Sequence, residues 1–122
     1  MVDILLNLDS SGSLKRLEMT GHADYPGNRR FRRKNSGMNP VCGIISLMAR
    51  SVARVTAARP GWTVDGNALE PGNLSLVINE RPEDTDEWLR GVTDTLLQAL
   101  ADVAGEYPGS VSVHIEESSD GS

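Results

Sequence analysis

Cysteine, aromatic residues and long apolar runs are all scarce in this chain of 122 residues. A single cysteine cannot form an internal disulfide, so we expect a reducing compartment, the cytoplasm, where the thiol stays available. Two histidines and one cysteine, widely scattered, match no zinc-ligand spacing, and we expect neither a metal nor a cofactor. Neither an apolar run of about 18 residues nor a signal-peptide pattern is present, so we expect no membrane span and no secretion.

Positive charge is also scarce outside one segment. The net charge is −5, with 12 basic and 17 acidic residues, so general attraction to nucleic acid is not expected. The exception lies in a long loop predicted for residues 24–39, where basic residues surround Phe31: Arg29, Arg30, Arg32, Arg33 and Lys34. This basic cluster is either a solvated surface loop or a docking surface for RNA or an acidic partner, with Phe31 available to stack.

Alternating apolar and polar residues predict several strands in a single domain, residues 1–117, followed by a disordered tail at 118–122. The predicted strands are Val2–Asp9, Leu14–Thr20, Trp62–Val64, Leu74–Asn79 and Val111–Glu116. The first two form a hairpin around residues 10–13. The dipeptide at 65–66, Asp-Gly, offers another hairpin turn after the short third strand.

Apolar residues at helical spacing predict two helices. The first runs from Pro40 to Ala58, and the second starts within Pro82–Asp86 and stops near Gly105. Asp84 and Glu87 are spaced like a capping box at the second start. The order strand-strand-helix-strand-strand-helix-strand predicts an α+β domain, in which both helices pack on one face of a mixed sheet. Trp88 lies on the buried stripe of the second helix, which favours the core over a substrate pocket.

Cys42 falls at the start of the first helix. Asn39 is a preferred N-cap residue, and Pro40 suits the first helical position. In the first turn, free backbone N–H groups and the helix dipole favour a thiolate. Cys42 is therefore a candidate nucleophile, although a lone cysteine at a helix start also occurs as a small buried apolar residue.

Two histidines could act as the base for this thiol. His22 directly follows the strand Leu14–Thr20 and Gly21, and a strand end is a rigid place to hold a base. His114 is one polar position on an alternating strand, which favours the protein surface. We therefore assign the base to His22.

The residues around this pair resemble a known family, the ribosomal-processing cysteine proteases (Prp). The family pattern is Gly-His-Ala, a loop, then Gly-x-Asp-x-Val-Cys-Ala and a helix with a serine four residues after the cysteine. This sequence has GHA at 21–23 and GMNPVCG at 37–43, and Ser46 is in place. The resemblance extends through the later strands and the second helix. Two departures are Asn39 in place of the aspartate and a longer segment between histidine and cysteine.

The resemblance implies a homodimeric cysteine endopeptidase with a Cys-His dyad. Cys42 would be the nucleophile and His22 the base, with backbone N–H groups near Gly43 as oxyanion donors and Asn39 and Ser46 as supporting residues. The substrate it implies is the N-terminal extension of large-subunit ribosomal protein twenty-seven. The basic cluster then lies beside the site, as a flap over the substrate or as a contact to the ribosome.

A second hypothesis is a ribosome- or RNA-associated binding protein of the same fold with weak or no proteolysis. Asn39 keeps the helix cap but lacks the negative charge that would stabilise an imidazolium. The basic cluster supports the same hypothesis. We favour the protease, because a Cys-His pair works without a third charged residue.

Overall fold

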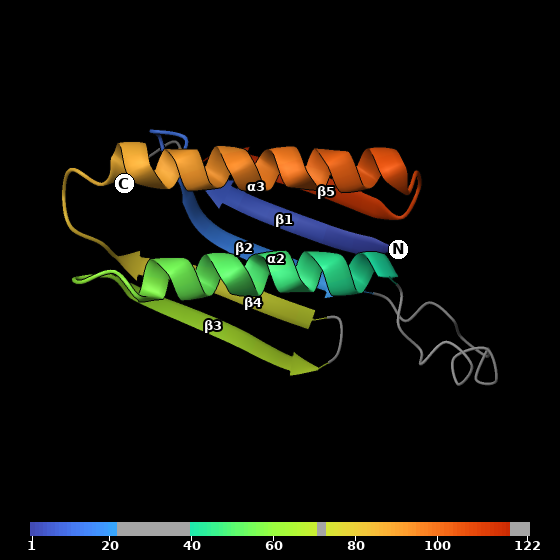
Figure 1. Cartoon of the computed structure of the whole chain (residues 1–122), viewed down its shortest axis with the longest axis horizontal. Helices are drawn as coiled ribbons and strands as arrows, with labels where there is room; N and C mark the ends of the chain where they lie inside the picture. The colour runs from blue at the N-terminus through green and yellow to red at the C-terminus, as the bar shows by residue number, and fades with distance from the viewer. Residues whose placement is uncertain (22–39, 71–72, 118–122) are drawn as a thin grey trace.

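The computed structural model describes residues 1–21, 40–70 and 73–117 (Figure 1). The predicted order of elements, and with it the α+β class, is confirmed. The elements are β1 (Val2–Leu8), β2 (Leu14–Gly21), α2 (Pro40–Ala57), β3 (Thr63–Glu70), β4 (Asn73–Glu80), α3 (Asp86–Glu106) and β5 (Val111–Glu117). Neither described helix is long and apolar enough to cross a membrane.

The strands form one mixed sheet in the order β3-β4-β2-β1-β5. The pairs β1–β2, β2–β4 and β3–β4 are antiparallel, whereas β5 lies parallel to β1. β4 and β5 run in the same direction with β2 and β1 between them, so their connection must cross the sheet, and α3 provides this crossover. The register pairs Val2 with Gly21 and with Val111, so the end of β2 meets the starts of β1 and β5 at one end of the sheet.

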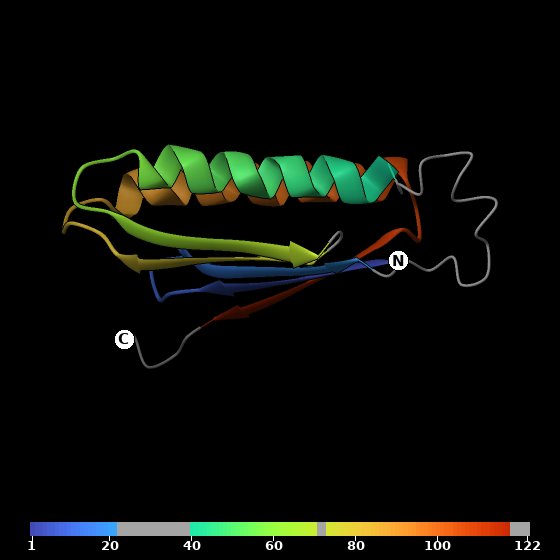
Figure 2. The same cartoon turned by 90° about the horizontal axis from the view of Figure 1, so that it is seen from below.

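Both helices cover the same face of the sheet, as predicted (Figure 2). The core lies between the two layers. It contains every second residue of β1 and the inward stripes of the helices, among them Ile4, Leu6, Leu17, Val41, Ile45, Leu76, Leu89 and Leu100. On β1 the intervening residues are only half-buried, because they point to the face that carries no helix.

The predicted turn at Asp65-Gly66 is wrong. Both residues lie inside β3, where Asp65 pairs with Val77 and Gly66 with Leu76, and the strand continues to Glu70. Asp-Gly favours a turn, but pairing along the whole length of β4 outweighs that local preference. The two residues are exposed on an edge strand, so neither is buried in an unfavourable environment.

The predicted capping box at Asp84 and Glu87 is also wrong. The N-cap of α3 is Thr85, whose hydroxyl donates to the Pro82 carbonyl over 2.7 Å and makes no cap hydrogen bond. Asp84 precedes the helix with φ at 67°, a left-handed conformation that aspartate tolerates. Because the chain turns at Asp84 before entering the helix, its carboxylate does not occupy the cap position.

The buried stripe of α3 contains one polar residue, Thr93, which is fully buried. Its hydroxyl donates to the Leu89 carbonyl over 2.8 Å and accepts the Leu14 N–H over 2.9 Å. The second hydrogen bond joins α3 to the start of β2. It satisfies a buried backbone donor that the β1–β2 turn leaves without a strand partner.

We predict that Thr93→Val lowers the free energy of unfolding by about 1–3 kcal/mol, because valine keeps the shape but leaves the Leu14 N–H unsatisfied. Urea unfolding measures the change. The control is Thr95→Val: the exposed Thr95 hydroxyl donates only to the Gly91 carbonyl of its own helix, so a change within about 0.5 kcal/mol is expected. Equal losses in the two variants would contradict the role assigned to Thr93.

Candidate functional site

Cys42 lies in the first turn of α2, as predicted, and forms no disulfide. The neighbouring Val41 and the next-turn Ile45 are buried in the core, which fixes the start of the helix against the sheet. Cys42 itself is half-buried and packs at the margin of the core. The first turn of α2 carries no acidic side chain, so no carboxylate within that turn opposes the positive end of the helix dipole at the thiol.

The end of β2 and the start of α2 lie at the same end of the domain (Figure 1). Gly21, the last residue of β2, pairs with Val2, and the Val2 N–H donates to the Ser110 carbonyl over 2.9 Å. This end of the sheet is therefore fixed by β1, β2 and the loop before β5. His22 follows Gly21 directly in the sequence. His22, Asn39 and the basic cluster at 29–34 lie outside the described residues.

Gly43 and Ser46 lie beside Cys42 on α2. Ser46 is half-buried, and its carbonyl accepts a 3.3 Å hydrogen bond from Arg50 Nε. Gly43 is half-buried as well, yet a Cβ atom added there would meet no described atom within 4 Å. Among the described residues nothing fills this position, and the structure brings Cys42, Gly43 and Ser46 together within about one helical turn.

We predict that Gly43→Ala raises the free energy of unfolding by about 0.5–1 kcal/mol, since alanine is the better helix former and has room at this position. Gly61→Ala is the matched control. Gly61 has φ at 85°, and its added Cβ would lie 2.9 Å from Pro82 Cγ, so this variant is expected to be destabilised. Thermal unfolding followed by circular dichroism compares the two, and a loss of stability in Gly43→Ala would show that the space is filled.

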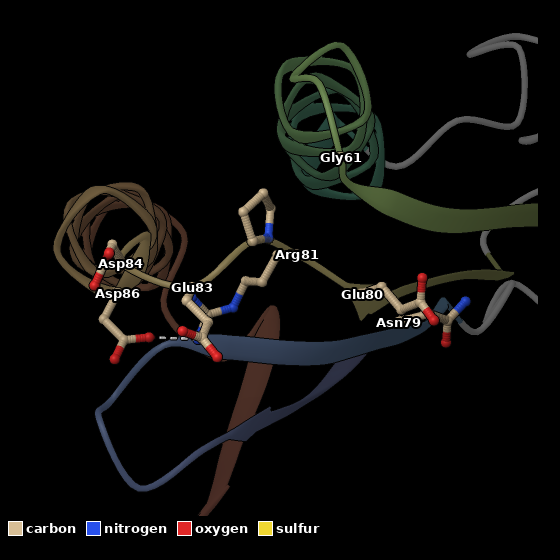
Figure 3. A pocket seen from close by; sticks show the side chains of 8 residues that line it. Gly61, Asn79, Glu80, Arg81, Glu83, Asp84 and Asp86 are labelled. Atoms are coloured by element: carbon tan, nitrogen blue, oxygen red, sulfur yellow. Dashed lines mark ion pairs between the residues drawn. The ribbon is translucent and has the colours of Figure 1, made fainter.

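A hollow of about 680 Å³ lies at the opposite end of the domain, where β4 leads into α3 (Figure 3). Arg81, one of the residues that line it, is bound by several polar groups of the chain. This guanidinium lies 2.7 Å from the Asp86 carboxylate, 3.1 Å from Asp9 and 2.7 Å from the Thr85 hydroxyl. Arg81 thus donates its hydrogen bonds to groups of the same chain and joins the β1–β2 turn to the start of α3.

Asp9 is the acceptor at the centre of this cluster. Burial alone would raise its pKa, but hydrogen bonds from Ser11 and Ser13 and the charge of Arg81 outweigh burial and lower the pKa. The carboxylate is therefore ionised at neutral pH and stabilises the fold above the pKa of an unfolded aspartate, about 3.9. That stabilisation is lost as the pH falls through the lower, folded value. Fully paired, these groups form a structural clamp.

The remaining predicted residues behave as the sequence indicates. His114 is exposed on β5, with Nε2 3.3 Å from the Ser112 hydroxyl, and Trp88 packs against the core. Among the described residues, no three histidine, cysteine or carboxylate side chains converge as a metal site.

The sequence did not indicate the partners of Trp88. Arg59 stacks 3.9 Å from the centre of its indole, and Trp62 packs edge-on against it at 5.4 Å. The sequence predicts Trp62 only as the first residue of a short strand and assigns no contact to Arg59.

No protein-family model matches the sequence, and no curated protein matches it either. Solved structures do. The ribosomal processing protease Prp from S. aureus, in complex with a covalently linked product peptide, matches with a TM-score of 0.68 and 17% identity, over 95% of this chain and 100% of that chain. The same protease in complex with a substrate peptide matches with a TM-score of 0.69 and 15% identity, over 95% of this chain and 100% of that one.

A protein from Streptococcus mutans is similar to the same extent. It matches with a TM-score of 0.67 and 18% identity, over 97% of this chain and 96% of that chain. The chain therefore has a Prp-like fold, which it shares with these structures at low sequence identity.

Proposed function

We propose that this protein is a cysteine endopeptidase of the Prp type, with Cys42 as its nucleophile. The observation that carries the proposal is the position of Cys42 in the first turn of α2, within a fold shared with a protease that was crystallised with a covalently linked product peptide. A thiol at a helix N-terminus is favoured as the thiolate, and no described atom lies within 4 Å of a Cβ added at Gly43, beside the thiol.

The proposed reaction is acyl transfer to sulfur. His22 takes the proton of Cys42, and the thiolate attacks the scissile carbonyl to form a tetrahedral intermediate. Backbone N–H groups near Gly43 donate to its oxyanion. When the C–N bond breaks, His22 gives the proton to the leaving amine. Water, deprotonated by His22, then hydrolyses the thioester and frees Cys42.

Asn39 and Ser46 have supporting roles in this proposal. Asparagine is a preferred N-cap residue, so Asn39 is proposed as the N-cap of α2 and as a side chain that orients the imidazole of His22. Ser46 presents a short polar side chain one turn beyond Cys42. Because asparagine lacks charge, it contributes less to an imidazolium than an aspartate would.

The proposed substrate is the N-terminal extension of large-subunit ribosomal protein twenty-seven. The processing role in the name of the S. aureus protease supports a ribosomal protein precursor as the peptide partner. In this proposal the protein works in the cytoplasm as a homodimer. The basic cluster, Arg29 to Lys34 around Phe31, contacts the substrate or the ribosome.

A second candidate function is binding to ribosome or RNA with little proteolysis. Asn39 and the basic cluster favour it, since five positive charges suit phosphate contacts. The two functions differ in whether Cys42 is ionised and whether a peptide is cut.

We predict that Cys42 reacts with iodoacetamide with a midpoint clearly below the pH of about 8.5 expected for a free thiol, because the helix terminus and His22 both favour the thiolate. Alkylation rates measured against pH by mass spectrometry give the midpoint. His22→Ala is expected to raise it, whereas His114→Ala, which changes the exposed histidine on β5, is expected to leave it unchanged. A midpoint at the free-thiol value in the unaltered protein would argue against an activated nucleophile.

We also predict cleavage of a synthetic peptide that spans the junction between the extension and the mature ribosomal protein. Cys42→Ala and His22→Ala are each expected to lower kcat by about three orders of magnitude or more, since they remove the nucleophile and the base. Asn39→Asp is expected to raise kcat by supplying the missing charge. Chromatography of the products measures the rates, and Ser112→Ala on the exposed face of β5 is the control.

Cleavage at the unaltered rate in Cys42→Ala would place the nucleophile elsewhere. If the unaltered protein binds the peptide or ribosomes but never cuts, the binding function replaces the protease.

A further inference from the structure

Gly66 is an unusual residue for the middle of a strand. Glycine weakens a strand interior, and where it occurs there it commonly marks a bulge, a bend or a place where another backbone approaches closely. β3 nevertheless continues through Gly66, which pairs with Leu76 of β4. The neighbouring Asp65 has a reason to be in the strand, because its carboxylate accepts a 2.6 Å hydrogen bond from the Asn79 side chain of β4. Gly66 needs a separate explanation.

The usual structural reasons for a strand glycine do not hold at Gly66. The register shifts of β3 lie between Thr63 and Val64 and after Asn67, so Gly66 is in regular register and forms no bulge. Its φ angle is not positive. A Cβ atom added to Gly66 would meet no described atom within 4 Å, so no described neighbour requires the missing side chain. Close approach of a backbone from outside the described residues is the remaining reason.

Gly66 lies on the helix face of the sheet, but neither helix covers it. Residues paired directly across two strands point to the same face, and Leu76 is buried beneath the helices. Gly66 faces the same way, yet it is exposed. β3 is the edge strand on the α2 side of the sheet, and α2 contacts it (Figures 1 and 2). Gly66 therefore presents bare backbone beside α2.

The side of α2 that carries Cys42 is the side towards β3. Ser51 lines a hollow between α2 and α3 together with residues of α3, so it marks the side of α2 that faces α3. Cys42 precedes Ser51 by about two and a half helical turns, so the two side chains point in opposite directions. Ala49 and Ala53 follow Cys42 by about two and three turns, on its own side of the helix. The thiol and Gly66 therefore lie along the same edge of α2.

The strand register gives the distance between Gly66 and the end of the sheet near the thiol. Gly66 pairs with Leu76, and Leu76 pairs with Leu17 of β2. Leu17 precedes Gly21, the last residue of β2, by about 13 Å of strand, so Gly66 is level with a point about 13 Å from that end. An extended peptide covers this distance in about four residues. Gly66 is thus within reach of a peptide whose scissile bond is held at Cys42.

We propose that the peptide substrate runs from Cys42 along the β3 side of α2, and that its backbone passes over Gly66 about four residues from the scissile bond. The missing side chain lets the peptide approach the strand closely. This path takes its ligand from the proposed function and therefore rests on it. Gly66 adds a contact that shorter peptides do not make.

Peptide length tests the path. The probes are fluorescein-labelled peptides across the junction between the extension and the mature ribosomal protein, one with six residues on each side of the bond and two shortened to two residues on one side or the other. Fluorescence anisotropy measures their binding to Cys42→Ala, which cannot cut them, with and without Gly66→Val. Valine is expected to weaken binding of the long peptide about tenfold or more, because its side chain occupies the space of the peptide backbone.

One of the two shortened peptides, the one that stops before Gly66, is expected to bind equally well with and without the valine. An unchanged affinity for the long peptide overturns the proposal. Equal weakening of all three peptides also overturns it, because the valine then disturbs the surroundings of the thiol and not a distant contact.

Asn67→Val is the matched control. Asn67 is the next residue of β3, is also exposed, and points to the opposite face of the sheet. Valine favours a strand more than glycine or asparagine does, so both variants are expected to unfold at higher urea concentrations than the unaltered protein. Only Gly66→Val is expected to weaken binding of the long peptide. A loss of stability in Gly66→Val would show that another part of the chain fills the space, and would overturn the proposal.

Cleavage assays distinguish this path from the proposed function itself. If the unaltered protein and Gly66→Val cut the long peptide with the same kcat/KM, the protease stands and the contact at Gly66 is wrong. If nothing is cut, but Cys42→Ala binds the long peptide and loses it with Gly66→Val, the contact stands and the protease is wrong. A long peptide that is neither bound nor cut overturns both.

Discussion

The parallel pairing of β5 with β1 is the constraint on which the rest of the domain depends. β5 follows β4 in the chain but lies beyond β2 and β1 in the sheet and runs in the same direction as β4, so the connection must cross the sheet, and α3 makes that crossing on the face that α2 already covers. The two helices therefore lie antiparallel in one layer. The start of α2, with Cys42, and the Arg81 clamp consequently lie at opposite ends, so the clamp stabilises the fold without approaching the thiol.

Alternation and helical spacing suffice to predict the elements, because one buried face imposes its period on every strand and helix. Strand order is different. The residues of Val2–Leu8 are compatible with a central strand or an edge strand. Its central position becomes clear only from its pairing with β2 on one side and β5 on the other. The errors fall where tertiary pairing overrides a local preference, at Asp65 in an edge strand and at Asp84 before α3.

For the candidate site, the first-turn position of Cys42 follows from Asn39, Pro40 and the apolar spacing, and it is confirmed. Whether His22 meets the thiol depends on the path of residues 22–39, which neither periodicity nor spacing determines. Thr93 and Arg81 could not be assigned from sequence either. Thr93 binds the start of β2, and Arg81 binds the β1–β2 turn and the start of α3. Most of these contacts join segments that are distant in the chain, so sequence patterns do not reveal them.

The contact of Arg59 with Trp62 and Trp88 has an optical consequence. These are the two tryptophans of the chain, and they pack edge-on at 5.4 Å where the end of α2 meets the start of α3. Indoles this close in a fixed orientation couple their electronic transitions, and a guanidinium 3.9 Å from the centre of one ring shifts its emission. The intrinsic fluorescence and near-ultraviolet dichroism of the protein therefore report the docking of one helix on the other, without any attached dye.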